Sequence, residues 1–118
     1  MLATDLILQK IQSLSGVKGC LVVGTDGLVI DSILPQSLDK DLVSALVSAI
    51  YTETYKQSMR FNRGQPKIII METDDSVLTV IQISVDKEIL YVFTEFKKGL
   101  DTTSIMESLK SVTSTFKQ

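Results

Sequence analysis

The chain has 118 residues, of which 44% are hydrophobic and 22% are charged, so it is long enough for one globular domain over residues 1–118 and too apolar to be disordered. Its net charge of −2 argues against a nucleic-acid-binding protein, because such proteins present a strongly basic surface. The single cysteine, Cys20, excludes an intrachain disulfide and a zinc site built from cysteines, and we expect a buried, unreactive thiol.

The chain carries no signal for export or membrane insertion. No basic N-terminal segment is followed by a long apolar run, and no stretch reaches the roughly 20 apolar residues needed to cross a bilayer. No internal repeat or long linker divides the sequence. The sequence therefore predicts a single cytoplasmic domain.

The first part of the chain predicts a helix followed by a β-hairpin. Thr4 can cap a helix over residues 3–15, which Gly16 would end. Strands are expected at residues 17–24 and 28–32. The Asp26-Gly27 pair between them can supply the positive φ angles that tight hairpin turns require.

A long central helix is predicted over residues 38–61, with Asp39 as its cap and Gly64 as its left-handed stop. The bulky side chains that we expect to cover a sheet are Leu42, Val43, Leu46, Val47 and Ile50. The small side chains that we expect on the outer side are Ser44, Ala45, Ser48, Ala49 and Thr52. No charge lies between Asp41 and Glu53, although a helix that covers a sheet normally has a charged outer stripe. The pattern favours a partner chain on the outer side over a helix enclosed within one domain.

Three further strands and a final helix complete the predicted fold. The strands are expected at residues 67–72, 77–83 and 89–94, and the helix begins after Gly99 with Asp101 or Thr102 as its cap. The element order α-β-β-α-β-β-β-α predicts an α+β fold, a five-stranded antiparallel sheet with helices on both faces.

The third strand is apolar on both sides and can lie at an edge of this sheet, where its backbone groups would be unpaired. An uncharged apolar edge promotes aggregation unless another chain pairs with it. One partner could cover both this strand and the outer side of the central helix. The predicted dimer interface comprises Ser44, Ala45, Ser48, Ala49, Thr52, Ile68, Ile69 and Ile70.

The residue inventory gives little support for catalysis or a cofactor. There is no histidine, which removes the commonest general base and metal ligand. The segment Gly24-Thr25-Asp26-Gly27 lacks the Gly-Lys-Ser/Thr ending of a phosphate loop, so we interpret it as a turn. The pairs Asp39/Asp41 and Asp74/Asp75 could hold a divalent ion, but a helix cap and a turn explain them more simply. We expect no enzyme, no metal and no cofactor.

The second half of the central helix offers candidates for contact with another protein. Tyrosine and methionine are enriched at interfaces, and arginine can steer an acidic partner or reach its phosphates. Cations near a helix C-terminus are also explained by the helix dipole, which we prefer for the two arginines. The candidate partner-binding residues are Val47, Tyr51, Tyr55, Met59, Arg60 and Arg63.

The hairpin sequence resembles the signature of the roadblock / dynein light chain family. The residues that carry the resemblance include Gly16-Val17-Lys18-Gly19 and Asp26-Gly27-Leu28-Val29, and the central helix and residues 68–72 continue it. The element order is similar over essentially the whole chain. The compact chain is similar to the prokaryotic members, among them MglB-type regulators of polarity GTPases, and the resemblance does not specify the subfamily.

The resemblance implies a profilin-like fold and a non-enzymatic function. It implies homodimers, or heterodimers with a paralogue, in which the third strands pair into a ten-stranded sheet and the central helices pack side by side. Our first hypothesis is a dimer whose paired helices bind a Ras-like small GTPase and stimulate GTP hydrolysis or serve as a scaffold. The alternative is an adaptor subunit of a larger motor-associated or membrane-associated complex, with binding that does not depend on the nucleotide.

Overall fold

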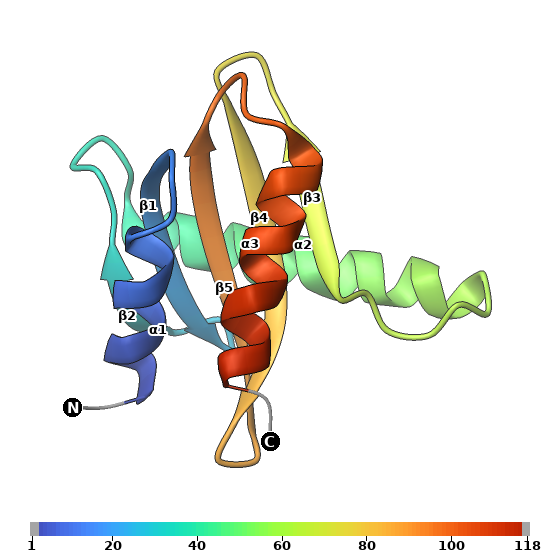
Figure 1. The fold of residues 1–118 in the computed structure, drawn as a ribbon. Coiled ribbons are helices and arrows are strands. Elements are labelled where there is room, and N and C mark those ends of the chain that lie inside the picture. Colours follow the sequence, from blue (N-terminus) through green and yellow to red (C-terminus); the bar gives the residue numbers. More distant parts are fainter. Residues whose placement is uncertain (1–2, 117–118) are drawn as a thin grey trace.

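The computed structural model describes residues 3–116, which form one antiparallel sheet between two layers of helices (Figure 1). The elements, in chain order, are α1 (Ala3–Gln12), β1 (Val17–Gly24), β2 (Val29–Ile33), α2 (Lys40–Arg60), β3 (Ile68–Glu72), β4 (Ser76–Val85), β5 (Glu88–Lys97) and α3 (Thr102–Thr115). The predicted element order and fold class are confirmed. The main differences in length are a shorter α1 and longer β4 and β5.

The five strands lie in the order β2-β1-β5-β4-β3, and all neighbouring strands are antiparallel. The β1–β2 hairpin joins the second hairpin through β1 and β5, so β3 is an edge strand, as predicted. Among the described residues, β3 pairs only with β4. One row of its backbone N–H and C=O groups is therefore open to another chain.

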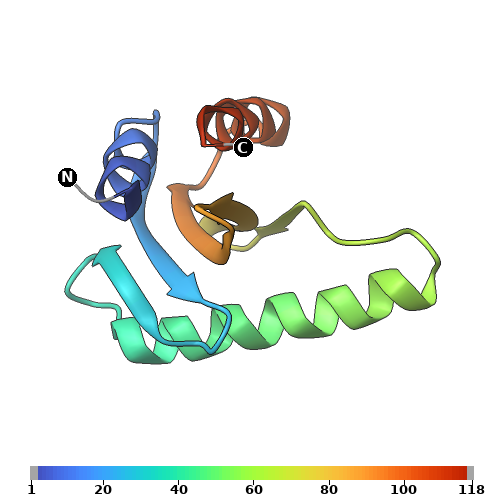
Figure 2. The same cartoon turned by 90° about the horizontal axis from the view of Figure 1, so that it is seen from below.

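The two faces of the sheet have separate cores. The helices α1 and α3 cover one face, and α2 alone crosses the other (Figure 2). Side chains of β1 alternate between the two faces: Cys20 and Val22 belong to the large core under α1 and α3, whereas Leu21 and Val23 belong to the smaller core under α2. This alternation explains why the central strands are apolar on both sides.

Two turns differ from the expected geometry. In the β1–β2 turn, Gly27 takes a positive φ of 84°, but Asp26 does not; its carboxylate instead accepts a hydrogen bond from the Leu28 N–H. The turn between β4 and β5 uses the left-handed region at both Asp86 and Lys87, which is the geometry of a two-residue hairpin turn.

Candidate partner-binding surface

The side of α2 that faces the sheet is not the side that the sequence predicted. Ser44 is only 1% exposed, and its hydroxyl donates a hydrogen bond to the carbonyl oxygen of Gly27 in the β1–β2 turn. A Cβ atom added at Gly27 would lie 3.6 Å from the side chain of Ser48. The small side chains therefore make room for a hairpin turn of the same chain. The prediction that Ser44 lies on the outer side of the helix was wrong.

Tyr51 fixes the middle of α2 to the sheet. Its ring stacks on that of Tyr91, with the ring centroids 4.4 Å apart, and its hydroxyl donates to the side-chain oxygen of Gln82. The carbonyl oxygen of Pro66 lies 3.2 Å from the same hydroxyl. Burial raises the pKa of Tyr51 above its usual value, and the neighbouring Tyr91 and Tyr55 add to this shift.

Burial also corrects two of the partner-binding candidates. Tyr51 is 4% exposed and Val47 is 1% exposed, and both belong to the smaller core. Their side chains stabilise the domain and are not available to a partner in this conformation. Tyr55, Met59, Arg60 and Arg63 are exposed.

The outer side of α2 carries the leucines that were expected to cover the sheet. Leu42 is 59% exposed and Leu46 is 53% exposed, so that expectation was wrong. Ala45, Ala49 and Thr52, from the predicted dimer interface, are exposed near them, whereas Ser48 is half-buried. The first half of α2 thus presents an outer apolar strip, defined here as Leu42, Ala45, Leu46 and Ala49. Exposed apolar patches of this kind typically mark protein–protein contacts.

The second half of α2 projects past the edge strand β3 (Figure 2). A helix of 21 residues is about 32 Å long, whereas five strands span only about 19 Å from the first to the last. A helix that crosses the strands must therefore extend beyond the sheet. Thr54 and Ser58 continue the helix side that carries Val47 and Tyr51, but in this second half the sheet of the chain no longer lies beneath it.

The end of α2 is held in a defined conformation. Asn62 takes the left-handed position with a φ of 58°, and the Arg63 N–H donates to the Ser58 carbonyl oxygen at 3.1 Å. The Ser58 hydroxyl donates to the Gly64 carbonyl oxygen at 2.6 Å. Asn62 is thus the left-handed stop that the sequence assigned to Gly64, although Gly64 also has a positive φ.

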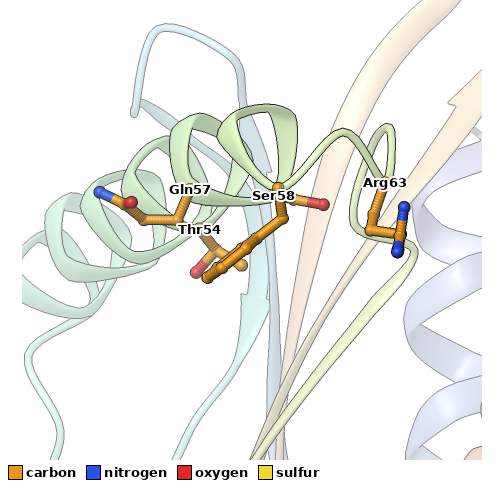
Figure 3. A pocket seen from close by; sticks show the side chains of 5 residues that line it. Thr54, Gln57, Ser58 and Arg63 are labelled. Atoms are coloured by element: carbon orange, nitrogen blue, oxygen red, sulfur yellow. The ribbon is translucent and has the colours of Figure 1, made fainter.

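A hollow of about 400 Å³ lies at this projecting end (Figure 3). Thr54, Gln57 and Ser58 line it from α2, and Arg63 lines it from the following loop, together with Phe61. Phe61 is 73% exposed, which is a large apolar surface for a side chain at a helix end. The hollow adjoins the projecting half of the helix and offers both an aromatic ring and a guanidinium group to a partner.

The three isoleucines of β3 that were predicted to lie in the dimer interface pack partly against the cores of their own chain. Ile68 and Ile70 pack against the large core, and Ile69 packs against the smaller one. All three are half-buried. Their side chains are therefore partly engaged by the chain itself, while the backbone edge stays open.

Potential metal ligands do not gather in residues 3–116, and the one cysteine is buried. No cluster of three or more potential metal ligands was found in this part of the chain. Burial, with a contribution from the Asp31 carboxylate, raises the pKa of the Cys20 thiol to about 11, which suits an unreactive core cysteine. No helix of the described residues is long and apolar enough to cross a membrane.

Sequence reasoning missed Leu42, Leu46 and Phe61 as exposed residues. The signal that it used, the absence of charge between Asp41 and Glu53, points to α2 as the helix with an unusual outer surface. It does not orient that helix, because both sides of an uncharged amphipathic segment can be buried. The hydrogen bond between Ser44 and the turn at Gly27, together with the burial of Val47 and Tyr51, shows which side faces inward.

Comparison with known proteins gives one consistent family. A family model described as Roadblock/LC7 domain matches residues 3–94. An uncharacterised protein of Methanocaldococcus jannaschii is 32% identical over 96 residues, which cover 81% of this chain and 82% of the relative.

Two bacterial proteins of known structure have the same fold. Myxococcus xanthus MglB is similar with a TM-score of 0.80 and 12% identity, covering 97% of this chain and 86% of that chain. A Roadblock/LC7 domain from Streptomyces avermitilis is similar with a TM-score of 0.74 and 18% identity, covering 94% and 92% of the two chains. At these identities the likeness extends to the fold alone.

Proposed function

Because the chain belongs to the Roadblock/LC7 domain family, we propose that it forms a dimer that binds a Ras-like small GTPase on the outer surface of its paired α2 helices. Members of this family are generally regulators and not enzymes. The observation that carries the proposal is the outer apolar strip of α2, which lies on the same helix as a projecting half with no sheet beneath it.

Two features support dimerisation, because a single partner chain could cover both of them. The backbone edge of β3 is open, and the projecting half of α2 extends past that edge. If a second copy adds its β3 to the edge, its sheet continues beneath the projecting helix and covers Thr54, Ser58 and Phe61. One two-fold contact then satisfies both features in each copy.

The GTPase surface is supported by what the dimer leaves uncovered. Leu42 and Leu46 point away from the sheet in the half of α2 that already has its own sheet beneath it. A dimer built through β3 leaves this half of the helix free on its outer side. Paired helices would bring two such apolar strips to one face, which gives a broad docking platform for a folded protein.

Dimerisation can be tested with a matched pair of exposed side chains. Phe61→Ser should raise the dimer dissociation constant at least about tenfold, because it removes an aromatic contact at the interface. Leu28→Ser is the control. Leu28 is 67% exposed and directly precedes β2, the strand at the opposite edge of the sheet from β3. Sedimentation velocity over a dilution series measures both constants. A monomeric wild-type chain, or equal effects of the two substitutions, would contradict the proposed dimer.

GTPase binding can be tested with the Ras-like GTPases of the same genome, loaded with GDP or with a non-hydrolysable GTP analogue. We expect binding to one of them in one nucleotide state, and we expect the double substitution Leu42→Ser and Leu46→Ser to abolish it while the dimer persists. Calorimetry measures the affinity. A stable complex with the same affinity in both nucleotide states would favour the adaptor function. The absence of binding in both states would refute the GTPase proposal.

The two arginines can be separated by hydrolysis measurements. If the dimer accelerates GTP hydrolysis, Arg60→Ala should reduce the rate more than Arg63→Ala, because Arg63 lines the hollow at the end of α2 that the second copy covers. An arginine that reaches the γ-phosphate contributes about 10³-fold or more to the rate, whereas a steering arginine changes mainly the affinity. Lys56→Ala provides a control on the same helix.

A further inference from the structure

A groove beside the start of β3 has an unusual charge for this chain. It has a volume of about 650 Å³ and lies between the beginning of β3, the end of β4 and the last turns of α3. The charged side chains that line it are Arg63, Lys67 and Lys110, and the apolar ones include Ile68, Ile83 and Phe116. Among the described residues, no aspartate or glutamate lines it, although the whole chain has a net charge of −2. The groove therefore suits a carboxylate carried on an extended, partly apolar segment.

The other end of the same strand is acidic. Glu72 is the last residue of β3, and Asp74 and Asp75 follow in the turn to β4, at the opposite end of the strand from the groove (Figure 1). The turn is held by Thr73, whose side-chain oxygen accepts hydrogen bonds from the N–H groups of Asp75 and Ser76. All three carboxylates are exposed.

Within residues 3–116, the groove cations and Glu72 have no ion-pair partner. In the part of the chain that the structure describes, the Arg63 guanidinium donates only to the carbonyl oxygen of Asn62. Lys97 of β5 pairs with Ser76, on the far side of β4 from the open edge. The edge strand thus has a basic end and an acidic end, both without a counterion.

Glu72 lies on the same face of the sheet as the groove. Side chains alternate along a strand, and Ile68 and Ile70 both pack into the core under α3. Glu72 follows at the same spacing, and its neighbour on β4, Val77, belongs to the same core. The side chain of Glu72 is therefore directed to the α3 side of β3, where Ile68 lines the groove.

We infer that the occupant of this groove is Glu72 of a second copy of the chain, an inference that rests on the dimer proposed above. Antiparallel pairing along the full length of two β3 strands places Ile70 opposite its own copy and Ile68 opposite Glu72 of the partner. Directly opposite side chains lie about 5 Å apart on the same face. The carboxylate then enters the basic groove, with Asp74 and Asp75 of the same turn nearby, and the contact occurs twice.

The same charges disfavour other ways of pairing two β3 strands. Parallel pairing would bring the acidic ends of both β3 strands to one end of the contact and the basic grooves to the other, so like charges would gather at each end. A shift of the strands by one residue would direct Glu72 to the opposite face, away from the groove. The two charged ends of β3 therefore favour an antiparallel partner whose Glu72 lies on the side of the groove.

A charge exchange between two variants tests this inference. In the first variant, Lys67→Glu and Lys110→Glu make the groove acidic; in the second, Glu72→Lys and Asp74→Lys make the turn basic. Each variant alone should dimerise about tenfold more weakly than the wild type, because both symmetric contacts change from attraction to repulsion. An equimolar mixture should recover wild-type affinity as a heterodimer, since each groove then meets a turn of opposite charge. Native mass spectrometry identifies the heterodimer, and sedimentation velocity measures its dissociation constant.

Controls keep the result specific to the groove. The substitutions Lys10→Glu and Lys18→Glu produce the same change in net charge as the first variant at exposed positions outside the groove, and should leave the dissociation constant within about twofold. Circular dichroism and urea unfolding establish that each variant is folded. Raising the salt concentration should weaken the wild-type dimer more than a Glu72→Gln dimer, because salt screens the ion pair.

The possible outcomes separate this inference from the dimer on which it rests. If wild-type dimers form and neither variant alters them, or if mixing restores nothing, the groove is not filled by the second copy and only the inference fails. If the first variant instead loses a co-purifying acidic protein while its dimer is unchanged, the occupant is that other protein. A wild-type chain that is monomeric at all concentrations overturns both the dimer and this contact.

Discussion

The two faces of the sheet are covered to very different extents. Under α1 and α3, fourteen buried residues of the described chain form the large core, whereas six form the core under α2. Two helices that lie side by side can cover a sheet of five strands, but one helix that crosses the strands cannot. The first face therefore provides most of the stability of the fold, and the second leaves apolar surface available for another protein.

The two edges of the sheet also differ in how α2 lies against them. At the β2 edge, α2 begins beside its own hairpin, and Ser44 joins helix and turn by a hydrogen bond. At the β3 edge the same helix continues into solvent, beyond the last strand (Figure 2). One helix thus has a half that completes the fold and a half that lacks a counterpart within the chain.

The strongest test of this comparison is a pair of leucine truncations. Leu109→Ala removes a side chain of 0% exposure from the large core and should lower the free energy of unfolding by about 2–5 kcal/mol. Leu46→Ala, on the exposed side of α2, should change it by less than about 0.5 kcal/mol when the protein is held at a concentration where it is monomeric. Urea unfolding measures both. Similar losses for the two variants would mean that the α2 surface is also part of the core.

A smaller effect tests which side of α2 faces inward. Ser44→Leu places a bulky side chain against the turn at Gly27 and removes the hydrogen bond to its carbonyl oxygen, which should cost about 1–3 kcal/mol. Ala45→Leu, on the adjacent exposed position, should have almost no effect on the monomer. Thermal and urea unfolding of both variants decide the orientation, and the opposite order of effects would restore the arrangement that the sequence suggested.

The smallest expected effect on stability concerns Tyr51, which holds α2 against the sheet. Tyr51→Phe keeps the ring stacked on Tyr91 but removes the hydroxyl that reaches Gln82, so it should lower the free energy of unfolding by about 0.5–1.5 kcal/mol. Tyr55→Phe, on the exposed part of the same helix, is the control and should leave stability unchanged. An equal response of both tyrosines would show that the hydrogen bond contributes nothing to holding α2 on the sheet.

Much of the fold could be predicted because it is encoded locally. Asp39 and Asp101 cap α2 and α3 through hydrogen bonds with nearby backbone N–H groups, and the predicted element order needed only turns and hydrophobic periodicity. The edge position of β3 was one arrangement that the sequence allowed, and the sheet order shows that this arrangement is the one adopted. The left-handed residue that ends α2 is Asn62, two residues before the predicted Gly64.

The sequence by itself determined the elements, their order, the sheet and the helix on which a partner is expected, because caps, turns and periodicity act between residues close in the chain. The tertiary structure alone decided how α2 is rotated. An uncharged helix with leucine on one side and serine and valine on the other can bury either side, and the choice depends on Gly27, a residue distant in sequence that fits only against small side chains. The same contact turns Leu42 and Leu46 outward and leaves the second half of the helix beyond the sheet.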